Sequence, residues 1–331
     1  MTASTPSKGL ENNEAEAHHS PRTFSERVRH IITVFWLLTE SNAPTFVAPN
    51  TVFGICGALS GSWIIQDASY SGSVTEVLSR LVHVVLFNWT NLFIFDLANQ
   101  RLDESAKEDA LNKPWRPVPR GLITSAQIQR TMLYLIPAVV AFNHYFLRMG
   151  PESMAIMILT WLYNDLRGGD EGFIQRNLII AVAFGIYNTG SVKVAAGPDA
   201  TQELAMFSGL TTKGLEWAFI VSVAIFTTMQ VQDLQDAEGD RARGRRSAPI
   251  ILGETAARWT VVVPMLIWPG LCAWYWDTGM VLGGTEVLLG TYVAVRCLLY
   301  SDPKADKITW QLWCLWTALI YTLPPLARHL S

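Results

Sequence analysis

The stretch "DLANQRLD", residues 96–103, follows directly on the apolar run "LVHVVLFNWTNLFIF", residues 81–95. A second acidic stretch, "DLQDAEGD", residues 233–240, stands in the same way after "WAFIVSVAIFTTMQVQ", residues 217–232. Acidic side chains at membrane depth are costly, and they are usually paired with cations and functional. The two placements therefore decide how the rest of the chain is interpreted.

The composition is that of a membrane protein. Of 331 residues, 50% are hydrophobic and only 16% are charged, whereas a soluble domain carries about 25% charged residues. Apolar stretches of about 20 residues, the length that spans a hydrocarbon core, recur after residue 44. We expect an all-α membrane protein with about nine transmembrane helices, and the short fourth stretch and Pro49 leave that count open by one. The nine stretches are 45–65, 74–95, 128–147, 154–166, 173–195, 215–232, 259–275, 281–299 and 310–327.

The first 25 residues are polar and lack the basic start and apolar core of a secretory signal peptide. They are predicted to form a disordered cytosolic tail, with the transmembrane catalytic domain over residues 26–331. The next segment, "ERVRHIITVFWLLTE", residues 26–40, interleaves apolar and basic residues. It suits a helix lying in the membrane interface or, equally, a plain helical lead-in to the first span.

The cysteines and the net charge exclude several classes of site. The four cysteines lie in apolar segments without paired spacing, so neither a disulfide framework nor a zinc site is indicated. The net charge of −3 shows no basic excess for nucleic acid. We expect membrane lipid and a small-molecule substrate as partners, and nothing implies an obligate protein partner.

The lysines and arginines predict the orientation in the membrane. With the tail in the cytosol, the loops after the second, fourth, sixth and eighth spans carry most of the basic residues, whereas the opposite loops hold little beyond Arg148 and Lys213. Both acidic stretches then end at the cytosolic face. This orientation and the missing signal peptide suit an integral protein of the endoplasmic reticulum.

The spacing within the two acidic stretches suggests a metal site. Asp96, Asn99 and Asp103 stand at i, i+3 and i+7, which places three side chains on one face of a helix. Asp233, Asp236 and Asp240 repeat that spacing. Two facing clusters of oxygen ligands suit Mg²⁺ and a phosphate substrate. The alternative is that these are helix-end residues solvated among lipid headgroups.

Cations follow both acidic stretches. "ESAKEDALNKPWRPVPRG" covers residues 104–121 and "RARGRRSAP" covers residues 241–249. A magnesium-bridged diphosphate needs carboxylates for the metal and Arg or Lys for the outer oxygens, with Arg offering a bidentate fork. The alternative is the ordinary basic bias of cytosolic loops.

With these motifs the chain resembles the UbiA superfamily of intramembrane prenyltransferases. The resemblance rests on the two acidic stretches, on "NKPWRP", residues 112–117, and on "GDRARGRRSAP", residues 239–249. The segment "NQRLDESAKEDALNKPWRP", residues 99–117, resembles the fungal branch of membrane-bound terpene cyclases, and within it the trans-bergamotene synthase type. The resemblance covers residues 27 to about 330.

The resemblance implies a fold and a set of roles. The fold is a bundle of nine transmembrane helices around a central cavity, with short helical caps over the cytosolic mouth. The six motif residues would be the metal-binding and catalytic residues. Cations for diphosphate would be Lys113 and Arg116 after the first motif, Arg243 after the second, and Arg176 at the start of the fifth span.

The chain also departs from the transferase pattern, which commonly reads NDxxDxxxD at the first motif. Phe95 stands in the Asn position and Asn99 in the central Asp position. An amide carbonyl oxygen can still bind Mg²⁺, so the metal site need not be lost.

Three functions remain open: a class I terpene cyclase, a prenyltransferase that needs an aromatic or other small acceptor, and an ion-coupled transporter. The first is favoured, as a magnesium-dependent cyclase that converts an isoprenyl diphosphate such as farnesyl diphosphate to a cyclic sesquiterpene such as beta-trans-bergamotene, with release of diphosphate. Aromatic faces steady a migrating carbocation. We expect Tyr163, Tyr187 and its polar neighbour Asn188 to line the cavity.

Overall fold

A computed structural model describes residues 23–198 and 205–330. These residues form helices joined by short loops, and the one strand-like pairing within them is an isolated antiparallel bridge between Ile65 and Leu210. The helices in chain order are α1 (Phe24–Thr39), α2 (Val47–Leu59), η1 (Gly61–Trp63), α3 (Val74–Ser79), α4 (Leu81–Gln100), α5 (Asp103–Asn112), α6 (Ser125–Tyr145), α7 (Gly150–Asn164), α8 (Gly168–Glu171), α9 (Phe173–Ala196), α10 (Thr212–Thr228), η2 (Met229–Gln232), α11 (Asp233–Arg243), α12 (Ala248–Leu252), α13 (Glu254–Trp276), α14 (Gly279–Leu299), α15 (Pro303–Ile320) and α16 (Leu323–Leu330).

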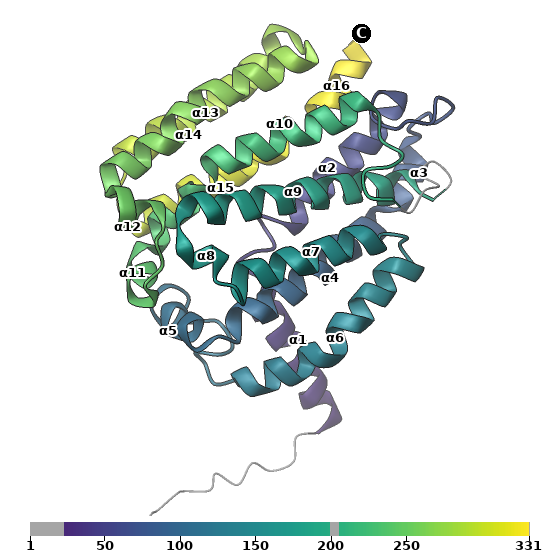
Figure 1. Ribbon diagram of the computed structural model, residues 1–331. Coiled ribbons are helices and arrows are strands. Elements are labelled where there is room, and N and C mark those ends of the chain that lie inside the picture. Colours follow the sequence, from purple (N-terminus) through teal and green to yellow (C-terminus); the bar gives the residue numbers. More distant parts are fainter. Residues whose placement is uncertain (1–22, 199–204, 331) are drawn as a thin grey trace, which may run out of the picture.

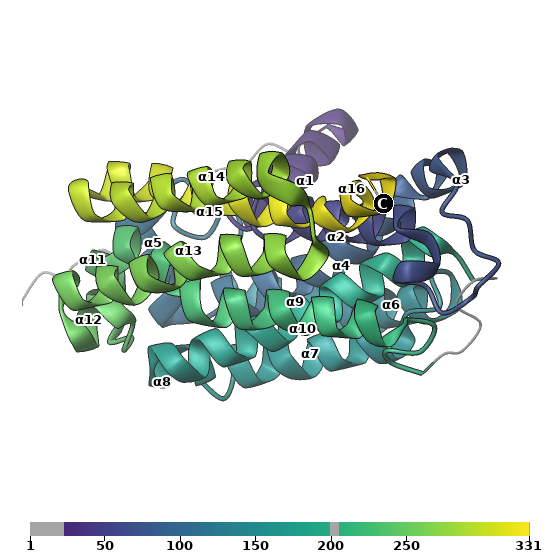
Figure 2. The same cartoon turned by 90° about the horizontal axis from the view of Figure 1, so that it is seen from above.

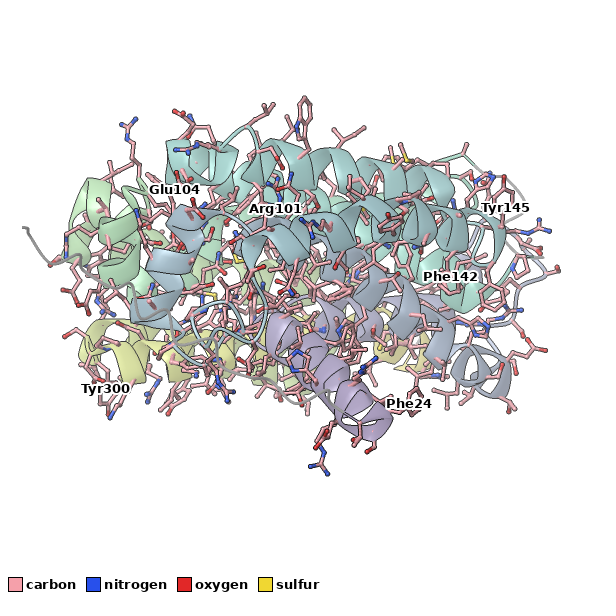
Figure 3. The ribbon with its side chains drawn as sticks, turned by 90° about the horizontal axis from the view of Figure 1, so that it is seen from below. Phe24, Arg101, Glu104, Phe142, Tyr145 and Tyr300 are labelled. Atoms are coloured by element: carbon pink, nitrogen blue, oxygen red, sulfur yellow. The ribbon has the colours of Figure 1, made fainter. Side chains whose placement is uncertain are left out.

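The long helices run side by side as a bundle (Figure 1). The short helices α5, α8, α11 and α12 gather at one end of this bundle, whereas α3 and the C-terminus lie at the other (Figure 2). We call the first of these the motif end, because both acidic stretches reach it. Seen from below, Glu104 lies toward the motif end and Tyr145 at the opposite end (Figure 3).

Each of the nine predicted apolar stretches coincides with a helix or with a consecutive pair of helices. The all-helical class is therefore confirmed. By length and hydropathy, five segments of the described chain qualify as candidate membrane spans: Leu81–Gln100, Phe173–Ala196, Thr212–Arg243, Glu254–Trp276 and Gly279–Leu299. The other stretches fold into helices that are shorter or less apolar, so the count of nine spans remains a prediction.

The predicted tail falls mostly outside the described residues, which begin at residue 23. Thr23 caps α1, since its hydroxyl accepts a hydrogen bond from the Glu26 amide and the Glu26 carboxylate accepts one from the Thr23 amide. Such a capping box satisfies two backbone donors that the helix leaves unpaired. Helix α1 packs against α4, and Phe24 at its start is exposed (Figure 3).

Helix α9 lies at the centre of the bundle and contacts α2, α4, α7 and α10. Its packing against α2 depends on small residues, because a Cβ atom placed on Gly54 would lie 2.7 Å from Ser191. A Cβ atom on Gly190 would likewise lie 2.6 Å from the Phe87 ring. Close contact on both sides holds α9 in a fixed position beside the cavity described below.

Candidate active site

The first acidic stretch is divided between two helices. Helix α4 ends at Gln100, and Leu102 adopts an extended backbone (φ −79°, ψ 137°) that redirects the chain into α5. Asp96 is fully buried in α4, whereas Asp103 is exposed at the start of α5. The prediction that Asp96, Asn99 and Asp103 share one helical face is therefore wrong, because the helix does not continue to Asp103.

The second acidic stretch forms one helix, α11, as its spacing predicted. Asp233 and Asp240 are fully buried, and the Asp236 side chain is 15% exposed. The helix stops at Gly244, which adopts the left-handed backbone (φ +79°) that glycine tolerates without strain. This turn lets the Arg245 amide donate to the Asp240 carbonyl over 2.9 Å, and it brings the Arg245 guanidinium back to the Asp240 carboxylate over 3.0 Å.

Helices α5 and α11 are joined by the amide of Asn112. Its Nδ2 donates to the Asp236 carbonyl over 3.0 Å, and its Oδ1 accepts from the Gly239 amide over 3.1 Å. A Cβ atom on Gly239 would lie 2.1 Å from the Asn112 side chain. The glycine thus permits the contact that sets α5 against the aspartates of α11.

We expect Gly239→Ala to lower the free energy of unfolding by about 1–3 kcal/mol, because the added methyl group displaces Asn112. Gly270→Ala is the matched control, since that helical glycine in α13 has open space around it. Thermal unfolding of the protein in detergent measures both. An equal effect of the two substitutions would contradict the role of the Asn112 contact.

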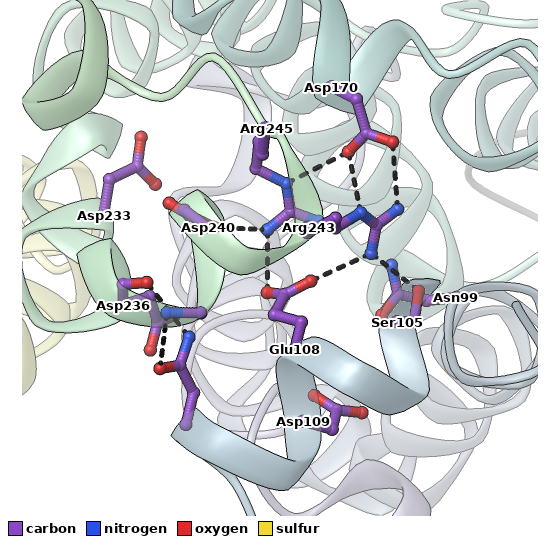
Figure 4. A network of polar contacts seen from close by, with 12 residues as sticks. Asn99, Ser105, Glu108, Asp109, Asp170, Asp233, Asp236, Asp240, Arg243 and Arg245 are labelled. Carbon is purple, nitrogen blue, oxygen red and sulfur yellow. Dashed lines mark hydrogen bonds and ion pairs between the residues drawn. The ribbon is translucent and has the colours of Figure 1, made fainter. Parts of the chain in front are cut away.

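Two arginines after α11 are held by acids from other elements (Figure 4). Arg243 donates to Glu108 over 2.9 Å and to Ser105 over 2.6 Å on α5, and it pairs with Asp170 of α8 over 3.0 Å. Arg245 donates to the other Glu108 oxygen over 3.0 Å and to Asp170 over 3.1 Å. This network ties the loop after α11 to α5 and α8.

The network also sets the ionisation of the acids on α5. Burial raises the pKa of Glu108, but Arg245, Lys113 and Arg243 outweigh it and lower the pKa to about 2. For Asp109 burial is the larger effect, and it raises the pKa despite the neighbouring Arg116. Glu108 therefore stays charged at neutral pH, as the anchor of two arginines.

Three further ion pairs bring predicted cations to the site. Lys113 Nζ lies 3.2 Å from an Asp236 carboxylate oxygen. Arg116 donates to both oxygens of Asp109, over 2.9 and 3.0 Å. Arg176 pairs with Asp233.

Arg176 has a second partner on α7, because its Nε donates to the Tyr163 hydroxyl over 3.0 Å. Arg176 reaches the site from the second turn of α9, so four separate elements, α7, α9, α11 and the segment after α5, meet at the motif end. Cations and acids thus alternate across this end of the bundle.

A cavity extends from these charges into the bundle. Its polar end is lined by Asn42, Asn99, Glu108, Lys113, Arg116, Tyr163, Arg176, Gln232, Asp236 and Arg245. Its deeper walls are apolar and are formed by Phe46, Leu92, Phe95, Ile156, Leu159, Thr160, Ile179, Ile180, Ala183 and Tyr187. The charged groups therefore lie at one end of a pocket that is otherwise mainly apolar.

Aromatic rings follow one another along this wall. The Tyr163 and Phe95 ring centroids lie 5.2 Å apart, Phe95 and Phe46 lie 6.3 Å apart, and Phe46 and Tyr187 lie 5.8 Å apart. Phe184 stacks on Phe46 at 4.6 Å. The rings form a continuous aromatic wall from the arginines to the depth of the cavity.

The structure places most, but not all, of the predicted site residues around this cavity. Asp96, Asp233 and Asp240 are buried at its polar end without lining it, whereas Asp103, Arg243 and Asn188 lie outside the lining that the described residues form. Sequence reasoning missed a second group of residues, which the helix ends bring in from distant segments. These are Asn42, Glu108, Asp109, Asn112, Asp170 and Arg245.

The donor atoms at the polar end suit a cation shared with a phosphate ligand. Asp96, Asp233 and Asp240 each hold one buried carboxylate oxygen with no hydrogen-bond partner among the described residues. Over the same part of the chain, no group of three or more Asp, Glu, His or Cys side chains could hold a metal alone. Mg²⁺ commonly takes only one or two carboxylates and completes its shell with water and substrate phosphate oxygens.

Comparison with known proteins identifies the family of this chain. The model of the UbiA prenyltransferase family matches residues 94–316, which include both acidic stretches. The chain belongs to the UbiA prenyltransferase family. The resemblance that the motifs suggested is thus confirmed.

Two named relatives align over most of the chain. Somaliensene A/B synthase of Streptomyces somaliensis is 28% identical over 320 residues, covering 91% of this chain and 97% of the relative. Fumagillin beta-trans-bergamotene synthase of Aspergillus fumigatus is 29% identical over 254 residues, covering 73% and 80%. Both relatives are named as synthases.

The fold also matches a solved UbiA structure. A UbiA homologue from Archaeoglobus fulgidus, bound to DMAPP and Mg²⁺, aligns with a TM-score of 0.55 at 12% identity, covering 90% of this chain and 99% of the homologue. This likeness shows a UbiA-like fold. With the five candidate spans, it supports an integral membrane protein.

Proposed function

We propose that this UbiA protein is a magnesium-dependent class I terpene cyclase that converts farnesyl diphosphate to a cyclic sesquiterpene, such as beta-trans-bergamotene, with release of diphosphate. One observation carries the proposal: a single cavity has Lys113, Arg116, Arg176 and Arg245 at one end and an aromatic wall beyond them. This arrangement matches a substrate with an anionic head and an apolar, cation-forming tail.

The reaction begins when the carbon–oxygen bond of the allylic diphosphate breaks. Negative charge then develops on the leaving group, so preformed cations at that position stabilise the transition state more than the ground state. Arg176 is held in place by Asp233 and Tyr163, and Arg245 by Glu108 and Asp170. Both guanidinium groups are therefore oriented before the substrate arrives.

The hydrocarbon part of the substrate would lie against the aromatic wall. A carbocation is attracted to the faces of Phe and Tyr rings by about 0.5–2 kcal/mol per contact when water is excluded. Tyr163, Phe95, Phe46 and Tyr187 offer such faces in succession. Their apolar surroundings also keep water from the cation. The reaction ends as a hydrocarbon when the cation gives a proton to the released diphosphate.

Mg²⁺ fits the same end of the cavity. The unpartnered carboxylate oxygens of Asp96, Asp233 and Asp240 would hold it, with Asn99 and Asp236 nearby on the cavity lining. When bound, the metal supplies a Lewis acid that neutralises the diphosphate oxygens. We propose these five positions as the metal-binding set and leave out the sixth motif residue, Asp103, because it lies exposed on α5.

Two observations favour a cyclase over a transferase. Phe95 occupies the position where the transferase motif commonly has Asn, and its ring packs against Tyr163 in the wall of the cavity. One of the two reported relatives is also named for a bergamotene, which is a sesquiterpene. We propose that the motif end faces the cytosol, on the distribution of basic residues. We also propose that the protein resides in the endoplasmic reticulum.

A prenyltransferase is the second candidate, and a specific opening favours it. A second pocket at the motif end shares Asn42, Lys113, Gln232 and Asp236 with the main cavity. Its other walls include Trp115, Lys304, Lys307 and Gln311. A small polar acceptor could dock there beside the diphosphate.

The two candidates differ in what happens without an acceptor. We expect purified protein with Mg²⁺ and farnesyl diphosphate alone to form hydrocarbon and diphosphate in equal amounts, with no acceleration by 4-hydroxybenzoate. A transferase gains much of its rate from the positioned acceptor, so it would release diphosphate slowly and yield farnesol or nerolidol. Gas chromatography and a diphosphate assay measure both products. If the reaction yields only alcohols and a phenol accelerates it strongly, the protein is a transferase and not a cyclase.

A further inference from the structure

Behind the aromatic wall lies a group of buried polar side chains that the proposed chemistry does not use. We call Asn50 of α2, Asn188 of α9 and Tyr321, which follows α15, the amide cluster. Each is at most 1% exposed. Within the described chain, both amide atoms of each asparagine and the Tyr321 hydroxyl have no hydrogen-bond partner.

The packing of α2 against α9 places the two asparagines at one level. One turn toward the motif end, Phe46 stacks on Phe184 with the ring centroids 4.6 Å apart. One turn in the other direction, Gly54 closely contacts Ser191. Asn50 and Asn188 occupy the turn between these contacts on their respective helices, so they lie at the same depth in the interface between α2 and α9.

Tyr321 contacts the cluster from a third segment, the turn after α15. Its ring lies 5.0 Å from the Phe53 ring of α2, edge to face. Its hydroxyl lies near the Asn188 amide of α9, but outside the geometry of a normal hydrogen bond. Thr45, which precedes α2, also contacts Cys314 of α15, with their side-chain atoms 3.8 Å apart. Asn50 lies between these two contacts in sequence, so α15 and the residue after it cover the side of α2 on which the amide stands.

The cluster is separated from the cavity by one pair of rings. Phe46 lines the cavity, and Phe184 stacks on it from α9. Asn50 follows Phe46 by one helical turn and Asn188 follows Phe184 by one helical turn. The two rings therefore lie between the amides and the motif end of the cavity.

Five unpartnered polar atoms at this depth need a ligand. Each buried group left unpaired costs about 1–3 kcal/mol, so native proteins pair such groups with protein atoms or with water. The ligand must donate and accept hydrogen bonds, because amides and a phenol present both kinds of atom. It must also be small and uncharged, because no charged side chain belongs to the cluster. Water satisfies these conditions.

We propose that the amide cluster binds ordered water, and that the Phe46–Phe184 pair keeps this water from the carbocation. The pair would thus decide whether the reaction ends as hydrocarbon or as alcohol. This consequence rests on the proposed function. If water passed the rings, its oxygen lone pair would form a carbon–oxygen bond to the cation, and the released proton would move to a second water of the cluster.

The bound water is tested first, without any turnover. Radiolysis by a synchrotron beam produces hydroxyl radicals from bound water in place, so a buried ring beside ordered water is oxidised. We expect oxidation of Tyr321 despite its burial, and its loss in Asn50→Leu/Asn188→Leu. Trp217 is the internal control, because it is equally buried but packs among the rings of Tyr275 and Trp276.

The barrier is tested second, by product analysis in H₂¹⁸O. We expect Phe184→Ala to raise the fraction of ¹⁸O-labelled terpene alcohol at least about fivefold, because the small side chain opens a path for water. Adding Asn188→Leu to that variant should return the fraction toward the original value. Phe53→Ala is the matched control, since Phe53 packs on Tyr321 but lies one turn beyond the cluster.

The outcomes separate the two proposals. If radiolysis does not oxidise Tyr321, the water site is overturned, and the amides pair with each other instead. If Tyr321 is oxidised but Phe184→Ala still forms hydrocarbon and no alcohol, the role of the Phe46–Phe184 pair as a barrier to water is overturned. If the protein turns over no isoprenyl diphosphate, the proposed function is wrong. The radiolysis experiment still tests the water site in that case, because it does not depend on turnover.

Discussion

Asp233→Ala is expected to reduce turnover of farnesyl diphosphate by at least about a hundredfold, because electrostatic groups of this kind contribute about 10²–10³ in rate. The substitution removes the unpartnered carboxylate oxygen proposed for Mg²⁺ and the acidic partner that orients Arg176. Asp96→Ala should have an effect of the same size, since Asp96 offers a similar buried oxygen from α4. Diphosphate release at saturating Mg²⁺ measures both.

Two matched variants make this prediction specific. Asp103→Ala should keep a rate close to that of the unmodified protein, because Asp103 is exposed and stands apart from the described lining of the cavity. Asn99→Asp should stay active, because a carboxylate replaces an amide oxygen at a cavity-lining position. A near-normal rate in Asp233→Ala would remove the metal assignment. A loss in Asp103→Ala equal to that in Asp233→Ala would contradict the geometry of the site.

Arg176→Gln is expected to lower stability by about 3–5 kcal/mol, because it leaves the buried Asp233 carboxylate without its partner. It should also abolish turnover, because Arg176 lines the cavity where the diphosphate would lie. The double variant Arg176→Gln/Asp233→Asn removes both charges. We expect it to recover most of the stability and none of the activity, as measured by thermal unfolding in detergent and by diphosphate release.

A second buried ion pair provides the control for this experiment. Lys193 Nζ lies 2.8 Å from Glu152 Oε1, and both side chains are fully buried at the opposite end of the bundle from the motifs. Lys193→Gln should destabilise the protein to a similar extent, but the folded fraction should turn over substrate at an unchanged rate. Recovery of activity in the Arg176→Gln/Asp233→Asn variant would show that the pair serves stability alone.

The sequence predicted the helices well, because the signal for them is local. A run of apolar residues long enough to cross a bilayer forms a helix whatever its neighbours are, since a backbone in lipid must satisfy its own hydrogen bonds. All nine predicted stretches fall on helices. The prediction failed where the pattern gave no warning: no proline or glycine lies between Asp96 and Asp103, yet α4 ends at Gln100.

Of the four predicted cations, the one after the second acidic stretch does not line the cavity. Sequence reasoning chose Arg243, but the structure turns Arg243 toward α5 and α8 and places Arg245 at the cavity. The choice is made by the left-handed turn at Gly244 and by the partners Glu108 and Asp170. Gly244 was a visible signal for the end of the helix, whereas the partners lie more than 70 residues away along the chain.

The sequence by itself determined the all-helical class, the family, and the concentration of acids and cations at the ends of particular apolar segments. These properties depend on composition and on short-range spacing, and both can be determined from short segments of the sequence. The tertiary structure decided which carboxylates are buried, which arginine faces the cavity, and that Asn188 lies outside the lining of the cavity. Those outcomes depend on how distant helices pack, because a side chain at a helix end is positioned by whichever element lies against it.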